Sequence, residues 1–396
     1  MTNQEVIQLT DEHILNTYKR FPVALSHGEG AKLFDFEGKS YIDFASGIGV
    51  CSLGYGNEPW IAAITAQVKK LPHTSNLFYT EPAALLANEL CKRTGMSGAF
   101  FSNSGAEANE GMIKLARKYS FDQYGAGRST IVTLTQSFHG RTVTTLAATG
   151  QDVFHNYFFP FTEGFVYAAT NDFESVKEAC AGGTVCAVMM ELIQGEGGVL
   201  PLEHDFVRQV EAYCEANDLL LLIDEVQTGV GRTGTLFCFE QYGIVPDVVS
   251  FAKGIAGGLP LGGILANKKC FAVLSAGTHA TTFGGNPICS AGALSVLDQL
   301  SPEFLKEVTA KGAYIRSEIQ KTNLPCVTSV RGLGLMVGIG VSVPHKEAVS
   351  ALIDHGLLTL TAGSDTIRLL PPLTITKEEI DEGLTIFKQV LGGLSA

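Results

Sequence analysis

The stretch that decides the fold is 219–225, Leu-Leu-Leu-Leu-Ile-Asp-Glu, in which five apolar residues run without interruption into two acids. A short continuous apolar run predicts a strand that is buried on both faces, as in a parallel sheet covered by helices. The alternation continues on both sides, with strand-like runs at 131–134, 186–192 and 248–251 and helical patterns at 106–120 and 205–217. This order predicts an α/β domain with a mostly parallel sheet and helices on both faces.

The character of the sequence changes on either side of this region. After residue 290 a long helical pattern is followed by several short strand-like segments, which predicts a smaller α+β domain. At the other end, two short strand-like segments predict an N-terminal arm with a small β-meander. We therefore expect three parts: the arm and meander at 1–59, the large α/β domain at 60–290 and the small domain at 291–396.

Composition and charge exclude several classes of protein. The 396 residues include 28 Lys and Arg against 40 Asp and Glu, for a formal net charge of −12, and no basic tract occurs. Such a chain is a poor candidate for nucleic-acid binding. No apolar run approaches the roughly 18 residues that span a bilayer, so we expect no membrane segment. The first residues lack a basic region followed by an apolar stretch, so we expect no secretory signal.

Cysteine and histidine usage favours a cytoplasmic protein without a metal. The nine Cys are odd in number, are scattered and form no C-x-x-C pair. This pattern favours reduced thiols in the core over a disulfide framework. The nine His show no spacing that is typical of a zinc site, so we expect no metal ligands.

A lysine and an aspartate follow two of the predicted strands. Asp224 ends the run at 219–223, and Lys253 follows the strand at 248–251 and precedes a glycine-rich turn. Lys253 alone is also consistent with an ordinary surface lysine. A buried aspartate, however, is costly unless a positive group meets it. A lysine that forms a Schiff base, beside an aspartate that holds a pyridinium nitrogen, is the pair that pyridoxal 5′-phosphate requires.

Possible phosphate donors lie where another predicted strand enters a helix. Residues 102–109, Ser-Asn-Ser-Gly-Ala-Glu-Ala-Asn, are small enough for backbone N–H groups to approach an anion at the helix N-terminus. The same pattern also fits an ordinary helix cap. Thr281 and Thr282 are further candidates for the phosphate. Phe138 is a candidate to stack on the cofactor ring, although a core aromatic residue is the alternative.

Six segments together resemble a known family. They are SNSGAEANE at 102–110, FHGRT at 138–142, ELIQGEGG at 191–198, IDEVQTGVGRTG at 223–234, FAKGIAGGLPLGG at 251–263 and THATTFGGNP at 278–287. In this order and spacing they resemble the class III, or ornithine-type, aminotransferases over nearly the whole chain. The resemblance implies the fold type I architecture: a large domain with a seven-stranded, mostly parallel sheet and a smaller α+β C-terminal domain. It also implies a cytoplasmic homodimer with shared active sites.

The resemblance further implies a role for each matched residue. Lys253 is the Schiff-base lysine and Asp224 pairs with the pyridinium nitrogen, and these two are the catalytic residues. The other cofactor contacts that it implies are Ser104, Gly105 and Ala106 at the phosphate, Phe138 and Val226 on opposite ring faces, Gln227 at the phenolic oxygen, and Thr282 at the neighbouring subunit's phosphate. The substrate residues that it implies are Arg141 and Arg368 for carboxylates, Glu196 as modulator of Arg368, and Thr281 beside the neighbouring subunit's substrate.

Within the family, the compact length and the C-terminal segment LTAGSDTIRLLPPLTI most resemble the members that act on N-acetylornithine with 2-oxoglutarate. Ile48 stands where members that act on free ornithine carry a tyrosine, which favours an acylated substrate. Tyr55 and Asn57 depart from the usual turn, and we expect them to alter the active-site entrance.

Several alternatives to this substrate remain open at the level of the sequence. Within the family they are N-succinylornithine, ornithine and 4-aminobutyrate. Outside it, a catalytically silent protein of the same fold is a further alternative. A nicotinamide-binding enzyme is disfavoured because no G-x-G-x-x-G follows the first strand.

Overall fold

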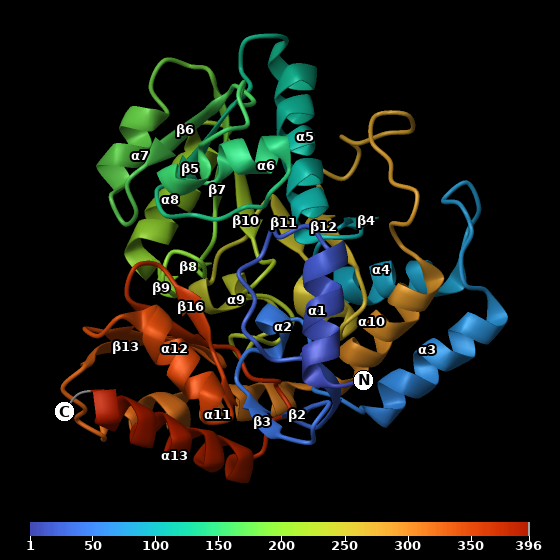
Figure 1. The fold of residues 1–396 in the computed structure, drawn as a ribbon. Helices are drawn as coiled ribbons and strands as arrows, with labels where there is room; N and C mark the ends of the chain where they lie inside the picture. The colour runs from blue at the N-terminus through green and yellow to red at the C-terminus, as the bar shows by residue number, and fades with distance from the viewer. Residues whose placement is uncertain (395–396) are drawn as a thin grey trace.

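A seven-stranded sheet forms the centre of the molecule. The computed structural model describes residues 1–394 (Figure 1). The strand order is β4-β12-β11-β10-β7-β5-β6, and only β12 runs antiparallel to its neighbours. The strands are β4 (Gly98–Ser102), β5 (Thr130–Leu134), β6 (Phe165–Ala168), β7 (Val185–Met190), β10 (Leu220–Asp224), β11 (Val248–Phe251) and β12 (Gly262–Ala266). The predicted α/β domain with a mostly parallel sheet is confirmed.

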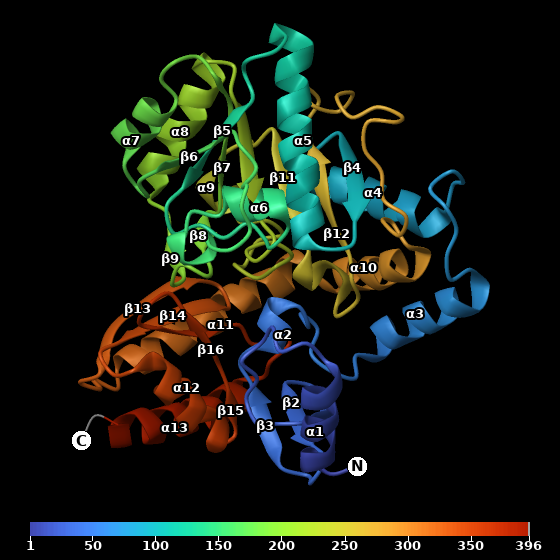
Figure 2. The ribbon, with the colours of Figure 1, turned by 45° about the horizontal axis from the view of Figure 1, so that its top comes forward.

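The apolar run that becomes β10 is buried on both faces of this sheet. Leu220 and Leu222 belong to one hydrophobic cluster together with residues of α5 (Gly105–Tyr124). Leu221 and Ile223 belong to another, which includes residues of α8 (His204–Ala216). Because successive side chains of a strand point to opposite faces, a continuous run of leucines supplies both layers. Figure 2 shows α5 lying along the sheet, with α7 (Phe173–Ala179) and α8 beyond its other side.

The C-terminal part builds a second layer of helix and sheet. Its antiparallel strand order is β13-β14-β17-β16. The elements are α11 (Pro302–Gln320), β13 (Val327–Leu333), β14 (Met336–Val341), α12 (His345–Asp354), β15 (Leu357–Leu358), β16 (Leu360–Ala362), β17 (Thr366–Leu369) and α13 (Lys377–Leu394). Every residue of β14 and β17 is buried, which makes these strands the centre of the small domain.

The N-terminal meander is not an independent unit. It contains β1 (Leu25–Glu29), β2 (Lys32–Asp35) and β3 (Ser40–Asp43), and α1 (Asn3–His13) precedes it. Strand β15 pairs in parallel with β3, so both ends of the chain contribute to one four-stranded sheet. The three-part division stays a prediction, and its second boundary at residue 290 falls inside α10 (Pro287–Gln299).

The remaining elements connect the two lobes and surround the strand ends. They are α2 (Ser46–Gly49), α3 (Glu58–Lys70), α4 (Glu81–Thr94), α6 (Val143–Ala148), η1 (Asp152–Phe154), β8 (Ile193–Gln194), β9 (Leu200–Pro201), α9 (Phe239–Tyr242) and η2 (Lys253–Ala256). Among residues 1–394, no helix has the length and apolar character needed to cross a membrane.

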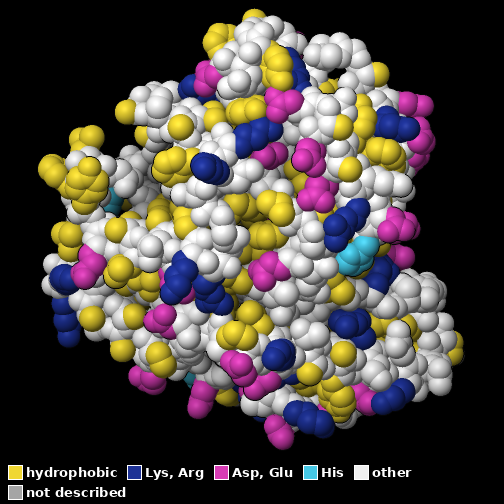
Figure 3. Space-filling model, turned by 180° about the vertical axis from the view of Figure 1, so that it is seen from behind, with side chains coloured by type: hydrophobic (Ala, Val, Ile, Leu, Met, Phe, Trp, Pro, Cys, Tyr) yellow, Lys and Arg dark blue, Asp and Glu magenta, His cyan; other side chains and the backbone are white. Residues whose placement is uncertain are grey.

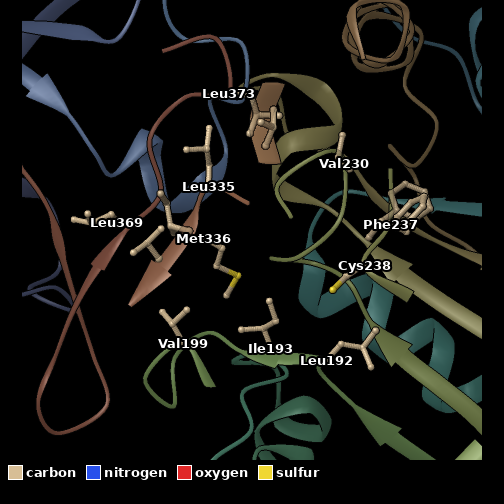
Figure 4. Packing of buried hydrophobic residues seen from close by; sticks show 14 of the residues in the cluster. Leu192, Ile193, Val199, Val230, Phe237, Cys238, Leu335, Met336, Leu369 and Leu373 are labelled. Carbon is tan, nitrogen blue, oxygen red and sulfur yellow. The ribbon is translucent and has the colours of Figure 1, made fainter. Parts of the chain in front are cut away.

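The two lobes meet through a continuous hydrophobic core. Figure 4 shows Met336 and Leu369 of the C-terminal sheet on one side and Ile193 and Val199 of the β8–β9 turn on the other. All four side chains are buried in the same cluster. This packing holds β17, which carries Arg368, against the turn that carries Glu196.

Candidate active site

The carboxyl ends of β4, β5, β7, β10 and β11 open onto one cavity of about 460 Å³. Open parallel sheets bind ligands at this edge, because the connections that follow the strands diverge there. Nine of the residues predicted for the site line the cavity: Ser104, Gly105, Ala106, Phe138, Arg141, Asp224, Val226, Gln227 and Lys253. They lie at the ends of four strands, β4, β5, β10 and β11, or in the connections that follow them, so the fold brings them together.

Asp224 is held by several donors at the end of β10. Its Oδ2 accepts a hydrogen bond from Asn109 Nδ2 at 2.8 Å and lies 2.8 Å from His139 Nδ1. Its Oδ1 accepts the backbone N–H of Val226 at 3.0 Å. These contacts fix the carboxylate in one orientation inside the cavity, where its charge would meet a cationic ring nitrogen.

Sequence reasoning did not identify Asn109 and His139 as side-chain partners of Asp224, nor Ser250, whose Oγ donates to Asp224 Oδ1 at 3.4 Å. Asn109 and His139 both lie inside segments that carry the family resemblance. Asn109 also donates to the backbone oxygen of His139 at 2.7 Å, so these two residues and Asp224 form one buried network. The available signal was chemical, because a buried carboxylate needs donors and these segments supply them.

Lys253 is a strained residue with a half-buried side chain. It follows β11 with a φ of 47°, a left-handed conformation that costs a non-glycine residue roughly 1–2 kcal/mol. Burial lowers its pKa to about 8, and the positive charge of Arg368 adds to this effect while Glu196 opposes it. A lysine with a lowered pKa is a ready nucleophile for a carbonyl group.

The first turn of α5 forms part of the wall of the cavity. A Cβ atom on Gly105 would lie 2.6 Å from Val226 Cγ1, so only glycine allows this close approach. Ser104 caps the helix by accepting the Glu107 N–H at 3.2 Å, which confirms the ordinary cap without excluding an anion at the neighbouring N–H groups. A helix N-terminus, an amine, a buried carboxylate and an aromatic ring around one cavity fit pyridoxal phosphate.

Glu191 connects two parts of the site. Its carboxylate accepts the backbone N–H of Phe138 at 2.8 Å and that of Gly195 at 3.1 Å. Burial raises its pKa to about 7, although the neighbouring His139 opposes the shift. Glu191 therefore joins the loop that carries Phe138 to the turn that carries Glu196.

Arg368 and Glu196 form an ion pair beside the cavity. Arg368 Nη1 lies 2.7 Å from Glu196 Oε1 and also donates to Gln227 Oε1 at 3.1 Å. The Arg368 side chain is 3% exposed and that of Glu196 is 32% exposed. Neither residue lines the cavity, but Gln227 does and bridges the pair to it.

Arg141 lines the cavity at its rim, and two more predicted residues, Thr281 and Thr282, do not line it. Arg141 is exposed, and its guanidinium carbon lies 4.1 Å from the centroid of the Phe154 ring. Thr281 Oγ1 accepts a hydrogen bond from Asn103 Nδ2 at 3.0 Å, and Asn103 lines the cavity. Thr282 is exposed and does not line this cavity. The contact of Thr282 with the cofactor phosphate of a neighbouring subunit stays a prediction.

The unusual turn makes structural contacts, and its expected effect on the active-site entrance stays a prediction. Tyr55 donates from its hydroxyl to the buried Asp43 at 2.8 Å. Asn57 caps α3 by accepting the Trp60 N–H at 3.0 Å. Neither residue lines the cavity. Ile48, which stands where members that act on free ornithine carry a tyrosine, is 43% exposed and has no hydroxyl group.

Several known proteins are similar to this chain over nearly its whole length. The model of the family described as "Aminotransferase class-III" matches residues 14–391. The acetylornithine aminotransferase of Haemophilus ducreyi is 49% identical, with 99% of each chain covered. The crystal structure of N-acetylornithine aminotransferase from Stenotrophomonas maltophilia is 36% identical with a TM-score of 0.85, covering 98% of this chain and 99% of that one. The ornithine aminotransferase of Toxoplasma gondii is 28% identical with a TM-score of 0.95, covering 100% and 96%.

Proposed function

This chain belongs to the class III aminotransferases, which depend on pyridoxal phosphate, and from that premise we propose its reaction. It transfers the terminal amino group of N-acetylornithine to 2-oxoglutarate, giving N-acetylglutamate 5-semialdehyde and glutamate, a step of arginine biosynthesis. Full-length similarity to acetylornithine aminotransferases supports this reaction. The observation that carries it is the meeting of Lys253, Asp224 and Arg141 in one cavity, with the Arg368–Glu196 pair beside it.

The chain's own residues would hold the cofactor and move one proton. When bound, pyridoxal phosphate supplies an electron sink for negative charge on the substrate carbon. Asp224 stabilises positive charge on the ring nitrogen, and Asn109 and His139 keep this carboxylate oriented. The Lys253 amine, with its lowered pKa, would take the proton from the substrate carbon that carries the amino group and pass it to the cofactor.

Two arginines would bind the carboxylates of the two substrates in different combinations. In N-acetylornithine the reacting carbon bears no carboxylate, whereas in glutamate it bears one directly. Arg141, at the rim, takes the remote carboxylate in both cases, and a guanidinium suits this task because its fork matches a carboxylate. Arg368 takes the near carboxylate of glutamate only. Glu196 neutralises Arg368 during the other half-reaction, since an unpaired buried cation is costly.

A substrate series tests the reaction. The holoenzyme should show its highest kcat/KM with N-acetylornithine when it is compared with N-succinylornithine, ornithine and 4-aminobutyrate. Arg141→Ala should weaken both half-reactions, because each substrate has a remote carboxylate. A higher kcat/KM with ornithine than with N-acetylornithine would contradict the proposal. Absence of turnover with all four amines would favour a silent protein of this fold.

We also propose a homodimer in the cytoplasm. The loop between α3 and α4 exposes Leu77, Phe78 and Tyr79, and Figure 3 shows hydrophobic side chains projecting from that edge of the molecule. Asn76 Nδ2 in the same loop donates to the backbone oxygen of Gly284 at 2.8 Å, so this surface adjoins the segment that contains Thr282. A second copy would cover the apolar loop and place Thr282 near its own phosphate site. All nine cysteines are free, which supports a reducing compartment.

A further inference from the structure

The side chain of Arg141 is held by aromatic rings alone. Its guanidinium carbon lies 4.1 Å from the ring centroid of Phe154 and 5.6 Å from that of Phe138. The two rings contact each other edge to face, with centroids 5.8 Å apart and an interplanar angle of 71°. Within residues 1–394, no carboxylate or carbonyl group accepts a hydrogen bond from Arg141. All its N–H donors therefore remain free.

This environment contrasts with that of Arg368. Arg368 is oriented by acceptors, because Glu196 and Gln227 both bind its Nη1 atom. A substrate carboxylate must replace such acceptors before it can bind. A ring face, by contrast, attracts the guanidinium and limits its motion without using any N–H group. Arg141 is thus oriented at the rim while its donors stay available for two parallel bonds to a carboxylate.

The chain anchors Phe154 next to the cavity from two sides. On one side the Gln151 side chain donates from Nε2 to the backbone oxygen of Ser137 at 3.0 Å. The backbone N–H of Phe154 donates to the backbone oxygen of Gln151 at 3.0 Å. On the other side His155 Nε2 lies 3.1 Å from the Leu146 oxygen. Because Ser137 directly precedes Phe138, these contacts tie the short helix η1 to the segment that carries the Phe138 ring.

We propose that Phe154 is a positioning residue that sets the selectivity of the enzyme for amines with a remote carboxylate. It acts through Arg141, whose guanidinium it orients while leaving the donors free, and it does not touch the reacting atoms. This inference rests on the proposed function, in which Arg141 binds the carboxylate that is distant from the reacting carbon. Phe154 lies outside every segment that carries the family resemblance, so sequence motifs alone do not indicate it.

Paired substrates test the role of the ring. Phe154→Leu should raise the KM for N-acetylornithine about three- to tenfold, because it removes one cation–π contact, and should change kcat less than twofold. The kinetics of N-acetyl-1,4-diaminobutane, which has the same amine and amide but no carboxylate, should not change. Phe154→Tyr should restore the wild-type KM because it keeps the ring face. Val153→Ala, at a neighbouring side chain that is 72% exposed, is the matched control.

A binding measurement provides a readout other than turnover. The dissociation constant of glutarate for the holoenzyme, measured by titration calorimetry, should rise by the same factor in Phe154→Leu and not in Phe154→Tyr. The visible absorption of the bound cofactor should be equal in all variants. If Phe154→Leu fails to fold, Phe154→Met removes the ring face with an unbranched side chain.

The inference is overturned if Phe154→Leu lowers kcat/KM equally for N-acetylornithine and N-acetyl-1,4-diaminobutane, or if glutarate binds Phe154→Leu as tightly as it binds the wild type. It is also overturned if Phe154→Tyr does not restore the wild-type KM for N-acetylornithine. Failure of the wild-type enzyme to use N-acetylornithine would instead refute the proposed function. In that case the glutarate titration still decides whether Phe154 orients Arg141.

Discussion

Replacing Glu196 by alanine should change the preference between the two half-reactions. In the wild type, glutamate must displace Glu196 from Arg368 before its near carboxylate can bind, whereas N-acetylornithine leaves the pair intact. In Glu196→Ala no displacement is needed, so the glutamate half-reaction should become more favourable. The N-acetylornithine half-reaction should weaken or stay unchanged, since its chain brings no charge to Arg368.

The magnitude follows from the burial of the pair. Breaking a fully buried ion pair costs about 3–5 kcal/mol. Glu196 is 32% exposed, and Gln227 remains as a neutral acceptor for Arg368, so the cost here should be smaller, about 2–3 kcal/mol. At 1.4 kcal/mol for each factor of ten, the ratio of kcat/KM for glutamate to that for N-acetylornithine should rise about 30- to 150-fold.

Single-turnover stopped-flow measurements of each half-reaction provide the assay, with the cofactor absorbance as signal. Glu203→Ala is the matched control, because Glu203 is exposed and does not line the cavity. Equal damage to both half-reactions in Glu196→Ala would refute the reasoning. An unchanged ratio would show that Glu196 does not compete with substrate for Arg368.

Three further predictions concern the catalytic pair and the assembly. Asp224→Asn should raise the activation free energy of the chemical step by several kcal/mol, in the range of a lost electrostatic contact in a site without water. Fast single-turnover chemistry in this variant would contradict the role of Asp224. In the cofactor-free protein, competitive labelling of the Lys253 amine should reach half its maximum near pH 8, because the amine loses its proton as the pH rises through its lowered pKa. Exposed Lys346 serves as internal standard, and a midpoint near 10.5 would be inconsistent with the lowered pKa. Mixing Lys253→Ala with Thr282→Ala subunits should restore activity up to about half per mixed dimer, since one site then carries neither change. No recovery after verified subunit exchange would count against the shared site.

The local pattern of apolar residues in the sequence was sufficient to predict the architecture of the large domain. The run that ends at Asp224 predicts a strand buried on both faces, and the structure places alternate leucines in the two clusters on either side of the sheet. The ends of parallel strands gather at one edge, so Lys253 and Asp224 could be predicted to meet without coordinates. Nine residues selected from the sequence line one cavity for this reason.

Contacts between residues that are far apart in the sequence could not be predicted from such local patterns. Arg368 meets Glu196 across 172 positions, and His139 meets Asp224 across 85. These pairs depend on how the small domain packs against the β8–β9 turn and on how the connection after β5 folds back. Nothing in the local sequence around either partner encodes that approach.

The sequence by itself determined the strand and helix periods, the family and the residue types of the site. The resemblance already implied that Glu196 acts on Arg368, whereas only the tertiary structure showed that Asn109 and His139 hold Asp224 and that Arg141 rests on Phe154 with its donors unused. The physical reason is that secondary structure depends on neighbours along the chain, whereas hydrogen bonds, ion pairs and ring contacts depend on distances that are set when distant segments are buried together.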